Sequence, residues 1–406
     1  MKIVQINTTC GIGSTGKICV DISKLLTQNQ IDNYILYSSK SNDYPLGIKC
    51  SNDMYIKLQA LKSRIFGNYG FNSRRATEKM ISELDHIKPD IVHLHNIHGH
   101  DCNLDTLLTY LKEQKIKLIW TLHDCWMLTA YCPHFVFAKC DKWKDGCFKC
   151  SQKRRFSWIF DKSSKLYEKK RELISGLDMT IITPSHWLSG IVKQSFLKKY
   201  PIKVINNGVD LNVFQPIKSI FRDKYGISVS QNIILGVAFD WGVRKGLDVF
   251  IELSKRLDNQ KYQIVLVGTD DAVSGHLPSN IISIHRTTNQ MELAEIYSAA
   301  DIFVNTTREE VLGLVNIESL ACGTPVLTFD TGGSPETIDL TCGSVVPCDD
   351  IDDLEHEIIR ICNERPYTEE ACVNRAKQFD KNDRYKEYLK LYKNISNDNP
   401  YTINSI

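Results

Sequence analysis

The sequence predicts an α/β protein of two Rossmann-like domains, each built around a parallel sheet. With 406 residues, the chain is long enough for two or three domains of about 150 residues each. Short apolar stretches that read as strands alternate with helical patterns, which is typical of βαβ units. Near the middle of the chain, the pair Asn207-Gly208 favours a turn. We therefore place the domain boundary near 205–217.

This boundary sets the predicted domain limits. The first domain would cover 1–205 and contain a cysteine-rich insert at 125–150. The second domain would cover 206–375. A C-terminal helix and a tail would take up 376–406.

Composition excludes several classes of protein. The formal net charge of +2 is too small for a nucleic-acid binder on charge grounds. No apolar run reaches the about 18 residues that a membrane-spanning helix needs. The N-terminal MKIVQIN enters a strand at once and does not resemble a signal peptide. The fourteen cysteines are therefore expected to be mostly free thiols in a reducing cytoplasm.

A glycine-rich loop follows the first predicted strand, KIVQIN. Gly11, Gly13 and Gly16 fit a dinucleotide-binding G-x-G-x-x-G, and the same stretch fits most of a Walker A loop. Ile18 stands where a Walker loop carries its Mg²⁺-binding hydroxyl, and the second strand ends in serines instead of the acid that a dinucleotide site needs. The loop is expected to be a glycine turn that lets backbone approach a ligand, with a purely structural turn as the alternative.

Two further strands end in polar side chains. PDIVHLHN and the residues after it contain His93, His95, His98 and His100. His-x-His at a strand end can bind a metal, but ligand type alone is weak evidence, and we favour a role without a catalytic metal. The next strand, KLIWT, is followed by His123 and Asp124, and His123 is the strongest candidate site residue of the first domain.

The insert after this strand contains a run of cysteines. Cys132, Cys140, Cys147 and Cys150 form C-x7-C-x6-C-x2-C. A terminal C-x-x-C in a cytosolic chain suits a structural zinc ion, and four free thiols are the alternative. Cys125 has no complete Cys-His relay around it in the sequence and is expected to serve packing.

The stretch 152–172 concentrates positive charge. It contains eight Lys or Arg against three Asp or Glu, with Phe156, Trp158, Ile159 and Phe160 among them. A basic and aromatic helix suits an anionic membrane surface or a lipid-diphosphate acceptor. A helix with its aromatic residues in the core and its lysines in water is the alternative.

The second domain opens with a strand, a turn and a helix that begins near Gly246. Arg244 and Lys245 stand directly before this helix. Two cations at a strand-to-helix turn would form an anion site for a diphosphate.

The stretch 301–336 predicts a βαβ unit with its polar residues at the end of the first strand, the edge at which open α/β sheets bind ligands. The helix would begin near Gly313, and the N–H groups of Gly313, Leu314 and Val315 would attract a phosphate. Glu310 and Glu318 flank this helix end. Because carboxylates repel phosphate, we expect them to hold hydroxyl groups of a sugar and a ribose. This combination describes a nucleotide sugar.

This stretch resembles the retaining glycosyltransferases of family 4, whose hallmark is Glu-x7-Glu followed by a small-residue helix, Gly-x-Pro-Val and a Gly-Gly turn. The resemblance implies that Glu310 contacts the transferred sugar and Glu318 the ribose. It implies that His123 reaches the donor sugar and its phosphate, and that the loop of Gly13 lies near the diphosphate and the acceptor. The family's usual arginine five residues before Lys245 is replaced by Asp240, and Arg244 is the candidate substitute.

The resemblance covers nearly the whole chain and implies the GT-B arrangement, in which two Rossmann-like domains face each other across a cleft and a C-terminal helix returns to the first domain. The implied activity is a retaining, metal-independent hexosyl transfer from a UDP- or GDP-sugar, with front-face attack because no nucleophile is evident. The insert resembles that of capsule, O-antigen and colanic-acid transferases, so the acceptor would be a lipid-linked bacterial surface glycan.

Several alternatives stay open at this point. They are a sugar-nucleotide epimerase or a phosphorylase of the same fold, a P-loop NTPase, and a non-catalytic sugar-nucleotide-binding module. Peripheral contact with the inner membrane would occur through 152–172, and no nucleic-acid partner is expected.

Overall fold

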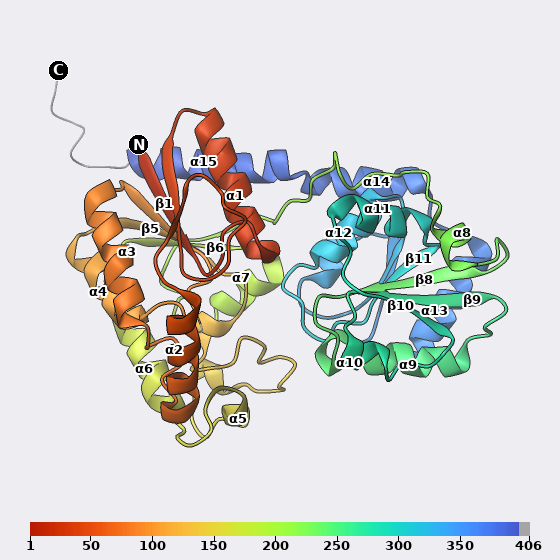
Figure 1. Ribbon diagram of the computed structural model, residues 1–406, viewed down its shortest axis with the longest axis horizontal. Helices are drawn as coiled ribbons and strands as arrows, with labels where there is room; N and C mark the ends of the chain where they lie inside the picture. Colours follow the sequence, from red (N-terminus) through yellow and green to blue (C-terminus); the bar gives the residue numbers. More distant parts are fainter. Residues whose placement is uncertain (99, 398–406) are drawn as a thin grey trace. The chain divides into compact units, whose positions relative to one another are not determined.

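The computed structural model describes residues 1–98 and 100–397. Among the described residues, the chain forms two compact units, one of residues 1–205 together with 385–397, and one of residues 206–384 (Figure 1). The second unit extends past the predicted limit of 375 because Ala376 and Phe379 belong to its core. The predicted tail, 398–406, lies outside the described residues.

The first unit is built on a seven-stranded parallel sheet of order β3-β2-β1-β4-β5-β6-β7. Its strands are β1 (Lys2–Asn7), β2 (Asp32–Tyr37), β3 (Gly47–Lys49), β4 (Ile91–Leu94), β5 (Lys117–Thr121), β6 (Met179–Thr183) and β7 (Ile202–Val204). Its helices are α1 (Gly13–Gln28), α2 (Asp53–Phe66), α3 (Arg74–Ile87), α4 (Leu104–Glu113), α5 (Lys153–Phe156), α6 (Ser163–Leu173) and α7 (His186–Val192), with short 3₁₀ turns at Trp126–Leu128 and Lys142–Lys144.

The second unit is built on a six-stranded parallel sheet of order β10-β9-β8-β11-β12-β13. Its strands are β8 (Asn232–Val237), β9 (Tyr262–Val267), β10 (Ile281–Ile284), β11 (Ile302–Asn305), β12 (Val326–Phe329) and β13 (Gly343–Val346). Its helices are α8 (Phe221–Tyr225), α9 (Leu247–Arg256), α10 (Asp271–Ser274), α11 (Gln290–Ala299), α12 (Leu314–Ala321), α13 (Ile351–Glu364) and α14 (Glu369–Ala376), with 3₁₀ turns at Val243–Lys245, Ser334–Thr337 and Lys377–Phe379.

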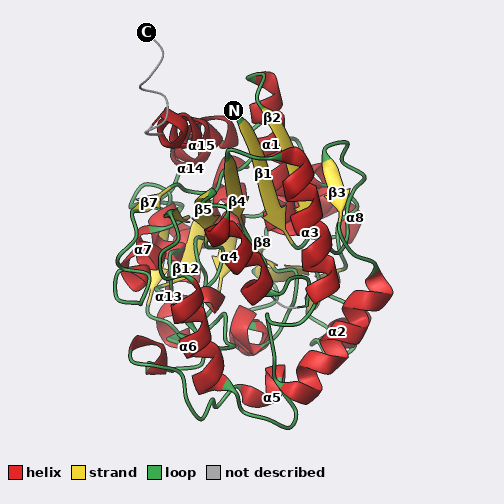
Figure 2. Ribbon diagram, turned by 90° about the vertical axis from the view of Figure 1, so that its left-hand side faces the viewer, coloured by secondary structure: helices red, strands yellow, loops and turns green. Residues whose placement is uncertain are grey.

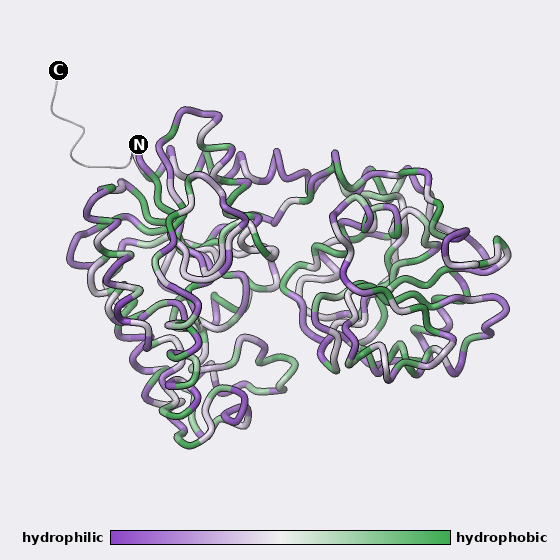
Figure 3. The backbone as a smooth tube through the Cα atoms, in the orientation of Figure 1, coloured by the Kyte–Doolittle hydropathy of each residue, from purple (hydrophilic) through white to green (hydrophobic). Residues whose placement is uncertain are grey.

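The central strands of both units are buried on both faces, because parallel sheets are covered by helices on each side. In β8, Ile233 and Leu235 belong to one core cluster and Ile234 belongs to the other. This explains why these strands read as continuous apolar runs. Figure 3 shows the hydrophobic residues along the central strands and the hydrophilic ones along the outer segments, and Figure 2 shows helices on the two sides of the first sheet.

The C-terminal helix α15 (Lys381–Asn397) completes the first unit. Tyr385, Tyr388 and Tyr392 pack in one cluster with Ile3 of β1 and Ile119 of β5. The prediction of two Rossmann-like units with a C-terminal helix that returns to the first is therefore confirmed.

The prediction of one basic helix over 152–172 is wrong. The chain forms α5, an extended segment and α6. The break occurs because the N–H of Trp158 donates to the carbonyl oxygen of Arg64 in α2 at 2.6 Å, which replaces a bond within the helix. Lys170 is fully buried; its Nζ donates to the carbonyl oxygens of Trp126 and Thr129 at 2.7 and 2.8 Å.

Candidate functional site

The carboxyl edge of the unit 2 sheet brings together the residues that the sequence singled out there. β8 is the first strand of this sheet in the chain, and its neighbours β9 and β11 lie on opposite sides of it. The loops after β8 and β11 therefore meet at the switch point where open α/β sheets bind ligands. The hydroxyl of Thr306, after β11, donates to the carbonyl oxygen of Lys245, after β8, at 3.0 Å. The two loops are thus fixed to each other.

Lys245 and Glu310 form an ion pair in this site. Lys245 Nζ lies 2.8 Å from Glu310 Oε2, and the two side chains are only 18% and 22% exposed. Burial alone would raise the pKa of Glu310, but the charge and hydrogen bond of Lys245, with the charge of Arg244, lower it below its usual range. Glu310 is therefore a carboxylate at neutral pH, ready to accept hydrogen bonds from hydroxyl groups.

The Gly-Gly turn holds the backbone of Glu310. Gly332 has φ +61°, and a Cβ built on it would lie 1.8 Å from the Glu310 carbonyl oxygen. The N–H of Gly333 donates to the same oxygen at 2.9 Å. A side chain at 332 would push the loop of Glu310 away, so the glycine is required by close backbone approach.

Arg308 is a site residue that sequence reasoning missed. Its guanidinium donates to both carboxylate oxygens of Asp248 at 2.8 and 2.7 Å, and its Nε donates to Asp349 at 2.6 Å. It also donates to the carbonyl oxygen of Val243, and its own N–H donates to the carbonyl oxygen of Arg244 at 2.9 Å. Arg308 thereby fixes the 3₁₀ turn that carries the two predicted cations. Its position directly before the paired glutamates was the available signal.

The first turn of α12 lies beside this pair. Gly313 is its N-cap, with φ +85° and no side-chain cap, so the first N–H groups, those of Leu314 and Val315 among them, lack an intrahelical acceptor. A Cβ on Gly313 would lie 3.5 Å from Glu310 Cγ. The structure therefore places Gly313, Glu310 and Lys245 together, as the sequence predicted.

Glu318 lies one turn further along α12 and faces α11. Its Oε2 accepts a hydrogen bond of 3.3 Å from the hydroxyl of Tyr297, which is fully buried. Glu318 is half-buried, and Tyr297 limits the directions in which the carboxylate can point.

A buried polar network holds the start of α12 against the sheet. Asn305 Nδ2 donates to Asn316 Oδ1 at 2.8 Å, and Asn316 Nδ2 donates to Ser334 Oγ at 2.9 Å and to Thr337 Oγ1 at 3.0 Å. The end of β11, the first turn of α12 and the 3₁₀ turn after the Gly-Gly pair are thus one rigid assembly.

The carboxyl edge of the unit 1 sheet has the same topology. β1 lies between β2 and β4, and the loops after β1 and β4 are joined by the N–H of Thr8, which donates to the carbonyl oxygen of Asn96 at 2.9 Å. Gly13 begins α1 at this edge with φ +69°, and a Cβ built on it would meet nothing within 4 Å. The glycine loop therefore lies at the same sheet edge as the histidines, and its approach to a ligand stays a prediction.

His93 is a packing residue. It is fully buried, and its Nδ1 lies 2.6 Å from the hydroxyl of Tyr392 in α15, while its Nε2 lies 2.8 Å from Thr121 Oγ1. Burial lowers its pKa well below the usual value. His93 is therefore neutral and couples α15 to the sheet.

Gln5, His95 and His123 form a chain of hydrogen-bonded side chains. Gln5 Nε2 donates to the carbonyl oxygen of Cys19 at 2.9 Å, which turns Gln5 Oε1 toward His95 Nε2 at 3.1 Å. His95 Nε2 must then carry the proton. Burial lowers the pKa of His95 well below its usual value, so its Nδ1 is an acceptor, and His123 Nε2 donates to it across 3.1 Å.

This chain determines the protonation of His123. Burial lowers its pKa to about 4, so at neutral pH the ring carries one proton, on Nε2, and Nδ1 is an acceptor. The sequence-based expectation was that His123 reaches the donor sugar and its phosphate. The hydrogen bonds favour a ring that accepts a hydrogen bond from a hydroxyl group, because phosphate oxygens cannot donate.

His98 and Asp124 form a separate pair. His98 Nε2 lies 2.7 Å from Asp124 Oδ2, and Asp124 Oδ1 accepts the N–H of Trp126 at 2.8 Å. Burial acts against both charges, but their mutual attraction raises the pKa of His98 and lowers that of Asp124 to about 2. This pair fixes the turn directly after His123.

The four cysteines of the insert line one small cavity together with Phe135 and Trp143. Within the described ranges, no group of three or more His, Cys, Asp or Glu is arranged to hold a metal ion. Structural zinc at the four cysteines stays a prediction.

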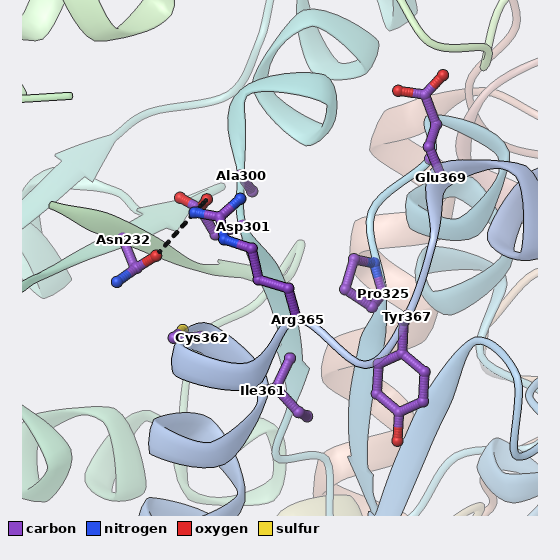
Figure 4. A pocket seen from close by; sticks show the side chains of 10 residues that line it. Asn232, Ala300, Asp301, Pro325, Ile361, Cys362, Arg365, Tyr367 and Glu369 are labelled. Carbon is purple, nitrogen blue, oxygen red and sulfur yellow. Dashed lines mark hydrogen bonds and ion pairs between the residues drawn. The ribbon is translucent and has the colours of Figure 1, made fainter. Parts of the chain in front are cut away.

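A cavity of about 190 Å³ lies at the opposite edge of the unit 2 sheet, where the strands begin (Figure 4). Arg365 points toward Asp301 and Asn232, with its Nη2 3.3 Å from Asp301 Oδ1. Arg222 Nη2 lies 2.5 Å from the other oxygen of Asp301. Because the two arginines already engage this carboxylate, and the cavity is at the amino ends of the strands, we assign it a structural role.

Comparison with known proteins covers both units. Residues 17–213 match the model described as Glycosyltransferase Family 4, and residues 218–382 match that described as Glycosyl transferases group 1. The chain is 22% identical over 365 residues to a putative colanic acid biosynthesis glycosyl transferase, WcaC, of Escherichia coli K12, covering 85% of this chain and 87% of the relative.

Two further likenesses span nearly the whole chain. An uncharacterized protein encoded in the cps region of Klebsiella pneumoniae is 23% identical over 402 residues, covering 97% of this chain and 99% of the relative. The structure of Anabaena HepE in complex with UDP aligns with a TM-score of 0.69 at 17% identity, covering 97% of this chain and 100% of HepE.

Proposed function

The chain belongs to the glycosyltransferases that join a family 4 domain to a group 1 domain in the GT-B fold, and we propose that it transfers a hexose from a nucleoside-diphosphate donor to a lipid-linked surface glycan, with retention. The observation that carries the proposal is the half-buried Lys245–Glu310 pair at the switch point of the unit 2 sheet, beside the N-terminus of α12.

The roles of the unit 2 residues follow from charge and geometry. Arg244, Lys245 and the α12 N-terminus bind the diphosphate, because cations and free N–H groups attract phosphate. Glu310 accepts hydroxyl groups of the sugar, and Glu318 accepts those of the ribose. Preorganised donors of this kind contribute about 10²- to 10³-fold to the rate each, and no step in this assignment needs a metal ion.

His123 accepts a hydrogen bond from a hydroxyl group of either the acceptor glycan or the donor sugar. Its unprotonated Nδ1 accepts a hydrogen bond from a hydroxyl group, and the Gln5–His95 chain keeps it in this tautomer. None of the residues assigned here is placed as a nucleophile, which supports front-face attack assisted by the departing diphosphate. Retention is tested by the anomeric configuration of the product, read by NMR before it equilibrates.

Three likenesses support the choice of substrates. HepE, of the same fold, binds UDP, which favours a UDP-sugar. The name of WcaC includes colanic acid biosynthesis and the Klebsiella relative is encoded in a cps region. Both favour a bacterial surface polysaccharide as acceptor. The proposed location is the cytoplasm, at the inner face of the membrane, where nucleotide sugars and lipid-linked glycans meet.

Calorimetry with UDP-, GDP-, ADP- and dTDP-sugars in the presence of EDTA tests the donor site. We expect one nucleotide class to bind and Lys245→Ala to weaken binding about tenfold or more, since a charged hydrogen bond is lost. Lys255→Ala, on the exposed side of α9, is the matched control. Failure of every nucleotide sugar to bind the wild-type protein would refute the proposal.

Glu310→Gln then separates an enzyme from a binding module. The amide keeps the shape of the side chain but removes the charge that faces Lys245. We expect turnover to fall by about 10²-fold or more, with donor affinity changed less than turnover. Unchanged turnover in this variant would exclude the proposed role of Glu310.

A further inference from the structure

Helix α2 buries two polar residues and exposes several large apolar ones. Gln59 and Ser63 are its buried residues. Met54, Leu58 and Leu61 are exposed by 75%, 53% and 47%. A surface helix normally turns its apolar stripe to the core, so this helix presents the opposite face from that expected of a soluble protein.

The exposed apolar residues form one stripe that is flanked by cations. Met54, Leu58 and Leu61 follow the i, i+4, i+7 spacing of one helix face. At 100° per residue, Lys57 lies on one side of this stripe and Lys62 on the other, and both are exposed. An apolar stripe between two rows of positive charge is the pattern of a helix that lies in a membrane interface.

The loop between α5 and α6 adjoins this stripe. Trp158, Ile159 and Phe160 are exposed by 54%, 57% and 48%. The loop is attached to the end of α2, because the N–H of Trp158 donates to the carbonyl oxygen of Arg64 at 2.6 Å and the Arg64 guanidinium carbon lies 5.9 Å from the Trp158 ring centroid. Both ribbon views show α2 beside α5 (Figures 1 and 2).

We call this region the α2 surface and define it by its exposed apolar residues, which come from α2 and from the adjoining loop. They are Met54, Leu58, Leu61, Phe66, Trp158, Ile159 and Phe160. Contiguous exposed apolar surface of this kind marks an interaction site.

We propose that the α2 surface binds the face of an anionic phospholipid bilayer. This inference rests on the proposed function in one respect: an enzyme with a lipid-linked acceptor has to reach that acceptor at the membrane surface. The charge around the surface favours anionic lipid over a protein groove: Lys57, Lys62 and Arg64 are exposed on α2, and Arg154 and Arg155 are exposed on α5.

The nearby acids offset only part of this charge. Asp53 is paired with Lys49 at 3.1 Å, which is not one of the five cations named above. Asp161, which accepts the N–H groups of Cys150 and Ser163 at 2.8 and 2.9 Å, adds a single negative charge. Among the described helices, none is long and apolar enough to cross a membrane. Because the apolar stripe occupies one face of α2, the proposed binding is interfacial, with Trp158 at the level of the lipid headgroups and the leucines just below them.

Co-sedimentation with lipid vesicles tests the proposal. The full chain is mixed with vesicles of phosphatidylcholine alone or of phosphatidylcholine with phosphatidylglycerol. We expect binding to the mixed vesicles, weakened by salt because the cations are screened. The double variants Leu58→Ser/Leu61→Ser and Trp158→Ser/Phe160→Ser should each lower the partition coefficient about tenfold or more.

Two controls make this test specific. Val229→Ser and Leu340→Ser remove apolar residues that are 95% exposed in the second unit and should leave vesicle binding unchanged. Lys57→Glu/Lys62→Glu should abolish the preference for anionic vesicles while retaining circular dichroism and thermal unfolding like those of the wild-type protein.

Three results would overturn the proposal. One is equal vesicle binding by wild type and the leucine and tryptophan variants. Another is wild-type protein that stays in the supernatant with both vesicles. The third is a vesicle-free dimer, seen by light scattering, that the leucine variant dissociates, since a second copy would then cover the surface. Donor binding by calorimetry is measured on the same samples, so a failed donor site and a failed membrane surface are told apart.

Discussion

At the residue scale, the chemistry of the first unit depends on which histidines are charged. His93 and His95 are buried and neutral, and His123 is neutral with a pKa of about 4. His98 alone among these has a raised pKa, because it faces Asp124. Histidine therefore has three roles in this one cluster at the strand ends. His93 packs in the core, His95 fixes the tautomer of His123, and His98 forms an ion pair with Asp124.

The buried neutral histidines predict acid sensitivity of the first unit. Their pKa values are lower in the folded protein than in the unfolded chain, where a histidine has a value of about 6.5. The unfolded state therefore binds more protons below about pH 6.5, and stability falls as the pH falls toward the folded values. His98, with its raised pKa, acts with the opposite sign, since its contribution is lost as the pH rises through its folded value.

Urea unfolding between pH 7 and pH 5 checks this prediction. The free energy of unfolding should fall by about 1.4 kcal/mol per pH unit for each such histidine. His95→Gln should make the slope shallower by about that amount, whatever it does to the stability at neutral pH. His86→Gln, at an exposed position of α3, is the control. A slope unchanged by His95→Gln would contradict the assignment of a neutral, buried His95.

At the element scale, the proposed donor site is held by turns instead of by long helices. The 3₁₀ turn of Arg244 and Lys245 is clamped by Arg308 through Asp248 and Asp349. The loop of Glu310 is clamped by the Gly-Gly turn. The site is therefore rigid because each ligand-facing loop has a second loop packed behind it.

Gly332→Ala tests the role of the Gly-Gly turn. The left-handed conformation costs an alanine about 1–2 kcal/mol, and the Cβ would overlap the Glu310 carbonyl oxygen, so Glu310 must move. We expect donor affinity, measured by calorimetry, to fall about tenfold or more while circular dichroism is unchanged. Gly242→Ala, in the loop after β8 with nothing within 4 Å, should bind normally. Equal affinities in the two variants would mean that the turn does not position Glu310.

At the scale of the whole molecule, α15 makes the first unit depend on the end of the chain. Leu391 is 3% exposed, and the hydroxyls of Tyr388 and Tyr392 reach Thr121 and His93. The stability of the first unit thus includes the part of α15 from Tyr385 on, which follows all of the second unit in sequence.

Leu391→Ala should destabilise the first unit by about 2–5 kcal/mol, the usual effect of emptying a buried leucine site. The second unit should be unaffected, because Leu391 packs in the first unit's cluster. Hydrogen exchange monitored by mass spectrometry checks this: amides of β1, β4 and β5 should exchange faster, and those of β8, β9 and β11 at the wild-type rate. Lys393→Ala, exposed on the same helix, is the control, and faster exchange in both units would contradict the prediction.

The sequence by itself determined the two series of βαβ units, the two glutamates that flank the start of α12, the cations before α9 and the family. These features are local: strand period, turn chemistry and residue spacing lie within a few dozen positions. Glu310, Lys245 and Gly313 came together as predicted, since parallel strands bring their carboxyl ends to one edge.

Only the tertiary structure decided which of these side chains are partners. His93 bonds to Tyr392 across 299 positions, Arg308 joins three loops, and the predicted basic helix breaks because Trp158 pairs with Arg64 of α2. The apolar stripe of α2 reads in the sequence like any core-facing helix. Its outward direction is set by packing, because periodicity shows that a helix has two faces and only its neighbours determine which of them meets water or lipid.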